Sequence, residues 1–429
     1  MNRAPYLIVG NSFAAMGGVD GIRKVDAEGS ITVIAREPYC AYSRPLVSYW
    51  LAGKVSDSQM LYRDRDFYDG NRAHTIFGTE ATHVDLQARV VQTSDGQFLP
   101  FEKLLIATGG KPIIPRDVTG MEVEGVFTFT TWDEARSIRD FIRENAIKKA
   151  VVVGGGLIGL RSVEALAALG IEVVVVELAD RILSATFDQT ASEVAQSHLE
   201  SAGVEVRCGT TISHIEKQGG KVVGVALRDN GEIACSLVVL AIGVTPNTDM
   251  VKGTAIEVEQ GIVVDQAMQT SVPGIYAAGD VAQAVDMLSG RKRPIPILPN
   301  AYRQGFIAGS NMAGKTLKYK GGIAMNSIDI LGLPTISVGI TTEEGETYEV
   351  VSMLDEEEPS YKKIVLKDDR VVGAIFLGDI DRAGIITGLI KEGIPVSSFK
   401  DLLLSEDFGV ISLPVEYRKH VVSGRGIEV

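Results

Sequence analysis

One structural unit occurs twice in the sequence, and this repeat constrains the fold more than any other feature. Each copy reads as a buried strand, a glycine-rich turn, a helix and a second strand. The first copy comprises Tyr6–Val9, Gly10–Ala15 and Ile31–Ile34, and the second comprises Ala150–Val153, Gly154–Gly159 and Glu172–Val176. This order is typical of the βαβ unit that binds a dinucleotide. The repeat therefore predicts an α/β protein with two three-layer, Rossmann-like domains and two nucleotide sites.

The second copy has glycine at each of the three positions that nucleotide binding requires. Gly154 permits the tight turn, Gly156 lets the backbone approach a pyrophosphate, and Gly159 lets the helix pack on the strand. The pyrophosphate is expected at the helix N-terminus, where free N–H groups and the helix dipole favour an anion. Glu177 ends the following strand, where an acid accepts hydrogen bonds from a ribose diol. Because Glu177 would repel a 2′-phosphate, the sequence favours NADH over NADPH; a purely structural glycine turn is the alternative.

The first copy departs from the pattern at two glycine positions. Ser12 and Ala15 stand in place of the second and third glycines. Ser12 still leaves room for a close approach, and alanine is an accepted third residue. The strand ends on Ala35 and Arg36, so the nearest acid is Glu37, which either binds a ribose or is a solvated loop residue.

Further motifs follow in a fixed order along the chain. They are Leu104–Gly109, Leu240–Asn247, Gly274–Asp280 and Pro299–Gly305. Together with the two turns they resemble, over nearly the whole chain, the FAD/NAD-linked reductases of the pyridine nucleotide–disulfide oxidoreductase superfamily. The resemblance is greatest to the NADH:rubredoxin reductase and nitrite reductase large-subunit branch, which includes flavoproteins encoded beside carbon monoxide dehydrogenases. It implies that the first copy binds FAD and that the second binds NAD.

The resemblance also implies which residues contact the two cofactors. Glu37–Leu46 resembles the flavin-edge segment of that branch, which places Arg44 and Pro45 near FAD; the alternative is a rigid surface loop, because Pro45 restricts Arg44 to an extended conformation. Asp280 is expected to bind ribityl hydroxyls at the start of the next helix, unless it only caps that helix. The candidate FAD residues are Gly10, Ser12, Phe13, Ala14, Ala15, Glu37, Arg44, Pro45, Thr108, Gly109, Gly279, Asp280, Asn300 and Ala301. The candidate NAD residues are Gly154, Gly156, Leu157, Ile158, Gly159, Glu177 and Gly243.

The chain has no cysteine where disulfide-reducing members of the superfamily have one beside the flavin. In the matched segment that position falls near Pro45, and Cys40 lies five residues earlier. Cys208 and Cys235 fall in expected strands of the NAD-binding region and are typical of small buried hydrophobic residues. We therefore expect flavin chemistry without a thiol relay, with Cys40 as a shifted redox thiol the alternative.

Arg161 is a second departure, because the family often has a glutamate near the nicotinamide at this position. Arg161 could contact the cofactor, pair with Glu164 at helical spacing, or face solvent. Apart from Arg161, no side chain is a candidate for catalysis, since the five histidines lie in no recognisable context.

The motif order predicts three domains. Residues 1–111 and 240–316 form a discontinuous FAD-binding domain around an NAD-binding domain at 112–239. Residues 317–429 form a C-terminal α+β domain, with short strands and a helix from about Asp381 to Lys391. By resemblance this domain is a candidate surface for homo-oligomer formation, and the tail from 408 to 429 is a candidate docking arm.

Composition excludes several other classes of protein. A net charge of −13 and a pI near 5.0 oppose binding to nucleic acid, and an acidic electron carrier would need a local basic patch to dock. Three widely spaced cysteines predict no disulfide framework, no iron–sulfur cluster and no metal site, and suit a reducing cytoplasm. The N-terminal residues lead directly into a strand, and charged residues interrupt the longest apolar region, so we expect neither a signal peptide nor a membrane span.

These features together predict an FAD-dependent oxidoreductase. Hydride would pass between NADH and FAD, and electrons would pass to or from a protein acceptor such as rubredoxin or a ferredoxin-type iron–sulfur protein. An NADH oxidase that reduces dioxygen directly and a non-catalytic flavoprotein subunit that senses NAD(H) are the alternatives. The sequence does not determine the acceptor or the direction of electron flow.

Overall fold

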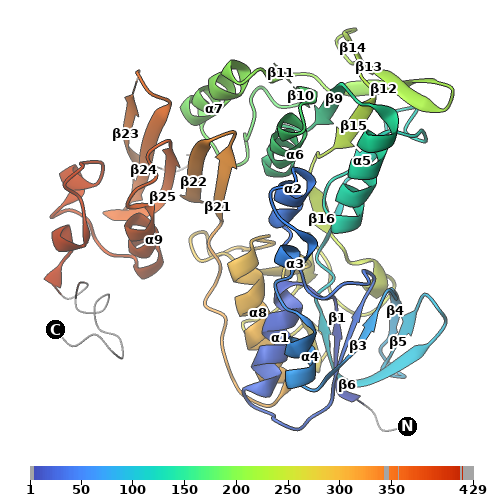
Figure 1. Ribbon diagram of the computed structural model, residues 1–429. Coiled ribbons are helices and arrows are strands. Elements are labelled where there is room, and N and C mark those ends of the chain that lie inside the picture. Colours follow the sequence, from blue (N-terminus) through green and yellow to red (C-terminus); the bar gives the residue numbers. More distant parts are fainter. Residues whose placement is uncertain (1–3, 343–346, 356, 416–417, 419–429) are drawn as a thin grey trace.

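Three parts make up the fold of this computed structural model, which describes residues 4–342, 347–355, 357–415 and 418. In Figure 1, the part with α1, α8 and β1 lies at the bottom, the part with α5, α6 and β9 lies above it, and the C-terminal residues lie to the left. One mostly parallel and one parallel sheet, each with helices, and one antiparallel C-terminal sheet confirm the predicted fold class.

The first glycine-rich unit lies in the middle of a seven-stranded sheet of order β3-β2-β1-β6-β5-β4, with β18 also paired to β6. The strands are β1 (Ala4–Val9), β2 (Ile31–Ala35), β3 (Ala73–Phe77), β4 (Ala81–Asp85), β5 (Val90–Thr93), β6 (Phe98–Ile106) and β18 (Ile275–Ala277). Pairing is parallel between β1, β2, β3, β6 and β18. The central strands are apolar and fully buried, as expected of a parallel sheet covered on both faces.

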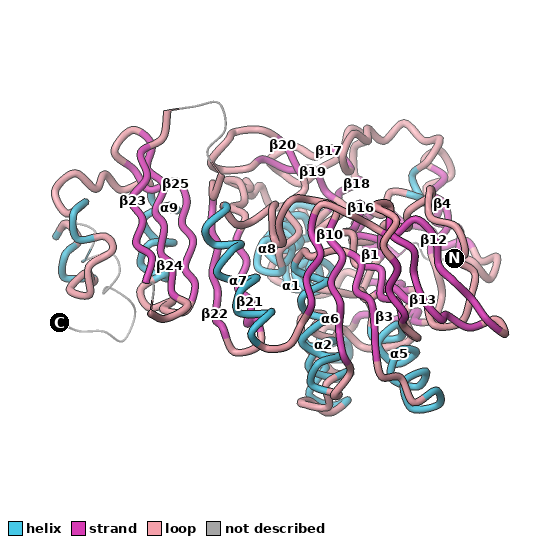
Figure 2. The backbone as a smooth tube through the Cα atoms, turned by 90° about the horizontal axis from the view of Figure 1, so that it is seen from above, coloured by secondary structure: helices cyan, strands magenta, loops and turns pink. Residues whose placement is uncertain are grey.

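Two glycine-containing helices pack closely against this sheet. They are α1 (Phe13–Arg23) and α8 (Leu298–Met312), which lie side by side in both Figure 1 and Figure 2. A Cβ added at Gly17 would lie 2.2 Å from the carbonyl oxygen of Tyr302, and one added at Gly305 would lie 1.9 Å from that of Ala14. The glycines therefore let the two backbones touch, which fixes the N-terminus of α8 beside the first turn. Short helices α2 (Leu46–Leu51), α3 (Asp57–Met60) and α4 (Arg65–Gly70) follow β2.

The second glycine-rich unit lies in a five-stranded sheet of order β11-β10-β9-β15-β8, in which every pairing is parallel. Its strands are β8 (Val126–Thr128), β9 (Lys149–Val153), β10 (Glu172–Glu177), β11 (Glu205–Cys208) and β15 (Leu237–Leu240). The accompanying elements are α5 (Trp132–Asn145), α6 (Leu157–Ala168) and α7 (Gln189–Ser201), with an antiparallel sheet of β12 (Ile212–Gln218), β13 (Lys221–Leu227) and β14 (Glu232–Ala234). A capping box starts α5, since Thr131 Oγ1 accepts from the Glu134 amide and the Glu134 carboxylate accepts from the Thr131 amide.

The chain passes between these two parts at a small antiparallel pair, β7 (Gly110–Pro112) and β16 (Val244–Pro246). These strands lie next to the residues at which the sequence predicts a change of domain. The exact domain boundaries stay predictions.

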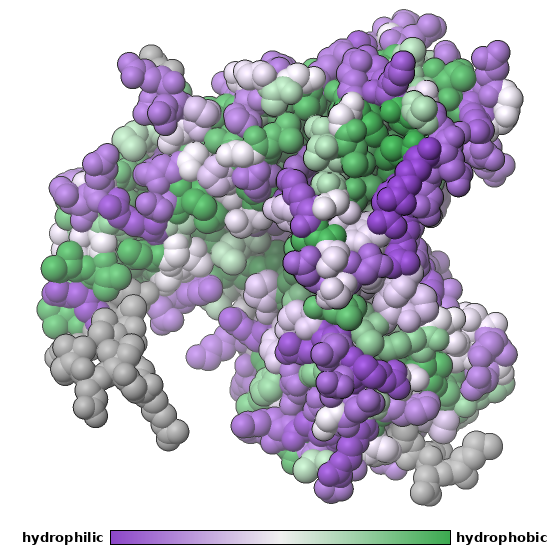
Figure 3. Space-filling model, in the orientation of Figure 1, coloured by the Kyte–Doolittle hydropathy of each residue, from purple (hydrophilic) through white to green (hydrophobic). Residues whose placement is uncertain are grey.

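The C-terminal part is an antiparallel sheet of order β21-β22-β25-β24-β23. Its elements are β21 (Met325–Ile330), β22 (Leu333–Gly339), β23 (Glu349–Asp355), β24 (Ser360–Lys367), β25 (Arg370–Leu377) and α9 (Ala383–Glu392), which packs on β25. The 3₁₀ helices η2 (Lys400–Leu402) and η3 (Val410–Ser412) follow, and most of the tail beyond Pro414 lies outside the described residues. Figure 3 shows hydrophilic side chains over much of the visible surface, with hydrophobic groups exposed on this part as well.

A buried ion pair joins the C-terminal sheet to the second part. Lys363 Nζ lies 2.8 Å from Asp188 Oδ2, and the Tyr361 hydroxyl donates to the same oxygen at 2.9 Å. Asp188 also caps α7, because its Oδ1 accepts from the Ala191 amide at 2.9 Å. The Asp188 carboxylate therefore stabilises the start of α7 and links the second part of the chain to the C-terminal sheet.

The expectation of a helix directly after Asp280 is wrong. The chain instead enters β19 (Ala282–Val285), which pairs with β17 (Ile262–Val263) and β20 (Lys292–Arg293). Ala282–Ala284 is buried between those neighbours, so strand pairing prevails, and the next helix is α8. Asp280 therefore caps no helix. Cys235 lies just after β14 and not within a strand.

Candidate functional site

One cavity of about 1440 Å³ connects the two glycine-rich turns. Its walls include Gly10 of the first turn, Gly154 of the second and Gly279 of the motif after β18. Typical small-ligand pockets have volumes of about 300 to 1,000 Å³, so this cavity has room for more than one ligand.

Most of the candidate residues line this cavity. From the FAD set these are Gly10, Ser12, Phe13, Ala14, Glu37, Arg44, Pro45, Thr108, Gly109, Gly279, Asp280 and Ala301, and from the NAD set they are Gly154, Gly156, Leu157, Ile158, Glu177 and Gly243. Ala15, Asn300 and Gly159 are not part of the wall. Ala15 belongs to the buried core, and Asn300 Nδ2 donates to the Ile295 carbonyl while its Oδ1 accepts from Tyr319. Their contribution is to the packing that shapes the cavity.

The two turns have matching backbone geometry. Gly10 has φ +116° and its amide donates to Ile34 O at 2.8 Å, while Gly154 has φ +108° and its amide donates to Val176 O at 2.8 Å. A Cβ added at Gly10 would lie 2.1 Å from Ala107 O, and one added at Gly154 would lie 2.5 Å from Ala241 O. Both distances are too short for a side chain. Only glycine fits either position, for steric and conformational reasons alike.

The helix that follows each turn begins without a side-chain cap. Ser12 precedes α1 and Gly156 precedes α6, both in extended conformation, and neither provides a side-chain hydrogen bond to the first turn. No heavy atom lies within 4 Å of a Cβ placed on Gly156. Each helix therefore offers free N–H groups and open space to an anion such as a pyrophosphate.

Glu177 lies at the edge of the second turn. Its Oε2 accepts from the Gly155 amide at 2.5 Å and its Oε1 accepts from the Ala179 amide at 2.8 Å. Two backbone donors thus hold the carboxylate against the cavity wall, where a ribose of a nucleotide on this turn would meet it.

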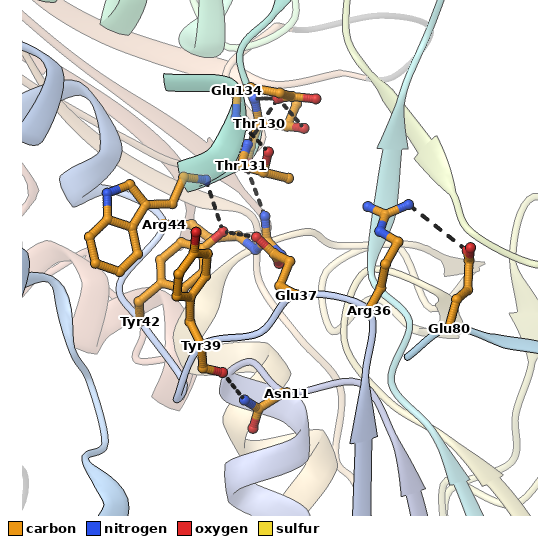
Figure 4. Close-up of polar contacts among 11 residues, drawn as sticks. Asn11, Arg36, Glu37, Tyr39, Tyr42, Arg44, Glu80, Thr130, Thr131 and Glu134 are labelled. Atoms are coloured by element: carbon orange, nitrogen blue, oxygen red, sulfur yellow. Dashed lines mark hydrogen bonds and ion pairs between the residues drawn. The ribbon is translucent and has the colours of Figure 1, made fainter. Parts of the chain in front are cut away.

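Glu37 is part of a hydrogen-bonded network beside the first turn (Figure 4). Its Oε1 accepts from the Tyr42 hydroxyl at 2.6 Å and its Oε2 accepts from Arg44 Nη2 at 2.8 Å. Arg44 Nη1 donates to Thr130 O at 2.7 Å, and the Trp132 amide donates to the Tyr42 hydroxyl at 3.1 Å. Glu37 is therefore more than a solvated loop residue, because it fixes Arg44 and Tyr42 in the wall.

Asp280 is a half-buried carboxyl in the cavity wall, near Arg44. Burial raises the pKa of Asp280, while the charge of Arg44 acts in the opposite direction. Nearby in the wall, the Oγ of Ser48 is buried without a hydrogen-bond partner. Buried polar groups are nearly always hydrogen-bonded in folded proteins, so Ser48 fits a polar ligand in the cavity.

Arg161 forms part of the wall on α6. Its Nη1 lies 2.8 Å from Glu164 Oε2 and 3.2 Å from the Tyr49 hydroxyl, and Lys54 Nζ lies 2.9 Å from Glu164 Oε1. Burial alone would lower the pKa of Arg161, but the hydrogen bonds with Tyr49 and Glu164 outweigh it and raise the pKa, so the cation is retained. Of the three alternatives for Arg161, the structure shows the pairing with Glu164. Two cations around one buried carboxylate leave a net positive charge here.

Several wall residues carried no sequence signal. They are Tyr39, Thr130, the stretch Arg293–Leu298 and residues Ala324–Ile328, which include the start of β21. These residues reach the cavity through contacts between distant segments, so no local pattern marks them. The only available hint was the resemblance of Glu37–Leu46 to a flavin-edge segment.

None of the three cysteines is adjacent to Pro45 in the sequence. Cys40 lines the cavity, half-buried, and burial raises the pKa of its thiol. A raised pKa disfavours the thiolate, which is the reactive form. Cys208 and Cys235 do not line the cavity.

Comparison with known proteins identifies the family. The family model described as pyridine nucleotide-disulphide oxidoreductase matches residues 4–305. The chain belongs to this family. The model of the rubredoxin NAD+ reductase C-terminal domain matches residues 325–394. The protein is therefore a flavoprotein oxidoreductase of the NAD(P)H-dependent type, with FAD as the family's flavin.

Individual members of the family resemble this oxidoreductase over most of their length. The NADH-dependent phenylglyoxylate dehydrogenase subunit epsilon of Aromatoleum evansii is 33% identical over 412 residues, which cover 94% of this chain and 96% of that protein. The NADH oxidase of Methanocaldococcus jannaschii is 32% identical over 321 residues, covering 73% and 71% of the two chains. Among solved structures, the reductase of the covalent putidaredoxin reductase–putidaredoxin complex is 26% identical with a TM-score of 0.83, and the match covers 91% of this chain and 93% of that one.

Within the described part of the chain, no group of three or more His, Cys, Asp or Glu side chains is arranged to hold a metal ion. Over the same residues, none of the helices has both the length and the apolar character needed to span a membrane.

Proposed function

We propose that this oxidoreductase oxidises NADH and passes the electrons to a small electron-transfer protein, without a redox-active cysteine. The observation that carries the proposal is the single cavity that connects the two glycine-rich turns. A flavin held on one turn and a nicotinamide held on the other could meet within it. When bound, FAD would supply the hydride-accepting ring and the release of electrons to the acceptor.

The first part of the chain would hold FAD. The amides at the start of α1 would bind its pyrophosphate, and Asp280 would accept hydrogen bonds from the ribityl hydroxyls. Arg44, fixed by Glu37 and Thr130, would place a positive charge at the flavin end of the cavity. Because Glu37 already accepts two hydrogen bonds, a ribose contact would be additional to its role in holding Arg44.

The second part would hold the nicotinamide nucleotide, with NADH preferred. The α6 N-terminus would bind the pyrophosphate and Glu177 the adenosine ribose. A 2′-phosphate would bring negative charge against the Glu177 carboxylate, and such like-charge contacts typically cost several kcal/mol. The name of the Aromatoleum evansii relative, which states NADH dependence, supports the same preference.

A thiol relay is not part of the proposed chemistry. Pro45 immediately precedes α2 and lies where a thiol is expected in disulfide-reducing relatives. The raised pKa of Cys40 also weakens the alternative of a shifted thiol. Positioning of the two rings against one another is then the main contribution of the protein.

The acceptor class is supported by the relatives. The C-terminal match is named after rubredoxin NAD+ reductase, and the putidaredoxin reductase structure was solved with its protein partner. The NADH oxidase from Methanocaldococcus jannaschii supports direct reduction of dioxygen as the second candidate function.

Turnover measurements separate these functions. We expect slow NADH oxidation by the holoprotein in air alone, and at least about tenfold faster oxidation after addition of rubredoxin or a [2Fe–2S] ferredoxin. Rapid turnover in air that neither protein increases would contradict the proposal and favour the oxidase. Very slow flavin reduction with tight NADH binding would favour the sensing subunit.

A further inference from the structure

A basic segment interrupts this acidic chain. Residues 287–328 contain seven of the 42 Lys and Arg residues and none of the 55 Asp and Glu residues. The whole chain has a net charge of −13, so the net charge of this segment is opposite in sign to that of the chain. Such asymmetry directs the association of charged partners.

The fold gathers five of these cations around one end of the cavity. Arg291, Lys292 and Arg293 lie on the hairpin of β19 and β20, and all three are exposed. Lys320 lies two residues before Gly322, whose amide donates to Val285 O at 3.0 Å and whose carbonyl accepts from the Met287 amide at 2.8 Å. The segment that contains Lys320 therefore runs beside that hairpin. We call Arg291, Lys292, Arg293, Arg303 and Lys320 the basic patch.

Arg303 joins the patch from α8. It is exposed, one turn beyond Pro299 in the cavity wall. Burial raises the pKa of Tyr319, and the charge of Arg303 opposes this shift, which places Arg303 near the residue that precedes Lys320. Figure 2 shows the hairpin strands β19 and β20 at the same side of the molecule as β17.

Most of these charges are not neutralised. Among the residues the structure describes, Arg291, Lys292, Arg303 and Lys320 have no carboxylate within 4 Å, and only Arg293 is paired, with the buried Asp286 at 2.6 Å. The Asp286 carboxylate also accepts from the Leu288 amide at 2.8 Å, so it holds the hairpin in shape. The surface of the patch is therefore positive and ordered.

The patch is continuous with the cofactor cavity. Arg293 and Ala324 line both the large cavity and an adjoining pocket of about 350 Å³, whose walls include Arg291 and Lys292. A protein seated on the patch would thus lie at an opening of the cavity, as electron transfer requires.

We propose that the basic patch is the docking surface for a small acidic iron–sulfur protein that accepts the electrons. This inference rests on the proposed function and adds the location and charge of the interface. One NADH would reduce two partner molecules by one electron each and release NAD+ and one proton, so electrons and charge balance.

The test is anaerobic stopped-flow with the holoprotein reduced by NADH and mixed with an acidic [2Fe–2S] ferredoxin. The double variant R291E/K292E is expected to lower the second-order rate of ferredoxin reduction at least about tenfold at low ionic strength. The difference should shrink at high ionic strength, since salt screens exposed charges. Reduction of the flavin by NADH and reduction of a neutral quinone by the enzyme should be unchanged.

K148E/K217E is the matched control. Both lysines are exposed in the second part of the chain, away from the patch, and the charge change is identical. An equal loss in this control, or no loss in R291E/K292E, would overturn the docking surface. If the natural chain is reduced by NADH but reduces neither this ferredoxin nor rubredoxin, both the docking surface and the proposed class of acceptor are wrong. If NADH fails to reduce the flavin, the proposed function itself fails.

Discussion

In the proposed function, the Glu177 side chain would favour NADH over the nearly identical NADPH. Two backbone amides fix its carboxylate at the second glycine-rich turn, so the charge cannot swing away from a ligand. In the first part, the half-buried acid Asp280 lies near Arg44, which Glu37 and Thr130 hold in position. At the scale of single residues, the site consists of charged side chains that hydrogen bonds hold in fixed positions.

Substitution of Glu177 tests its role directly. In E177Q the side chain keeps its shape but loses its charge, so repulsion of a 2′-phosphate should disappear. We expect the ratio of kcat/KM for NADPH to that for NADH to rise at least about tenfold, equivalent to about 1.4 kcal/mol. Steady-state kinetics with both nucleotides measure this ratio.

E172Q is the control for that measurement, because Glu172 lies exposed at the opposite end of the same strand. An unchanged ratio in E177Q would remove Glu177 from the specificity of the site.

At the level of elements, the repeated unit was predictable and its surroundings were not. Strand, turn and helix appear in the sequence as a buried apolar run, glycines and a helical stretch, and both copies form β1-α1-β2 and β9-α6-β10. The positions of Gly10, Gly154 and Glu177 in these turns could be predicted because they depend on local backbone geometry.

The remaining elements depend on long-range contacts. The stretch after Asp280 was expected to be helical, but pairing with β17 and β20 makes it β19. β21 and the contribution of Asn326 to the cavity wall had no local signature, because that strand reaches the cavity through tertiary packing. Residues that reach a site from a distant segment are therefore the ones that cannot be predicted from a single sequence.

The ion pair between Asp188 and Lys363 gives a prediction about how elements are joined. D188A would remove the carboxylate that forms a buried pair with Lys363 and accepts from Tyr361, and would leave α7 without its cap. Breaking a buried pair from one side typically costs 3–5 kcal/mol, so we expect the free energy of unfolding to fall by about 3 kcal/mol or more. Denaturant unfolding of the holoprotein measures the change.

D69A provides the comparison, since Asp69 forms an exposed pair with Arg65. Its effect should stay below about 1 kcal/mol. Equal stability of D188A and the natural chain would mean that Asp188 does not hold the second part and the C-terminal sheet together.

Across the whole molecule, the basic patch and the cofactor cavity lie next to one another. Two nucleotide-binding parts share a cavity, the C-terminal sheet contributes β21 to its wall, and a positive patch adjoins it on an otherwise acidic protein. This arrangement would bring NADH, flavin and a protein acceptor within reach of one another. Oligomer formation through the C-terminal sheet stays a prediction.

The most direct test of this function is anaerobic stopped-flow absorbance of the flavin-loaded protein mixed with NADH and, separately, with NADPH. The proposal predicts rapid bleaching of the flavin band by NADH and bleaching at least about tenfold slower by NADPH. Absence of bleaching by either nucleotide would contradict the transfer of hydride between the two sites.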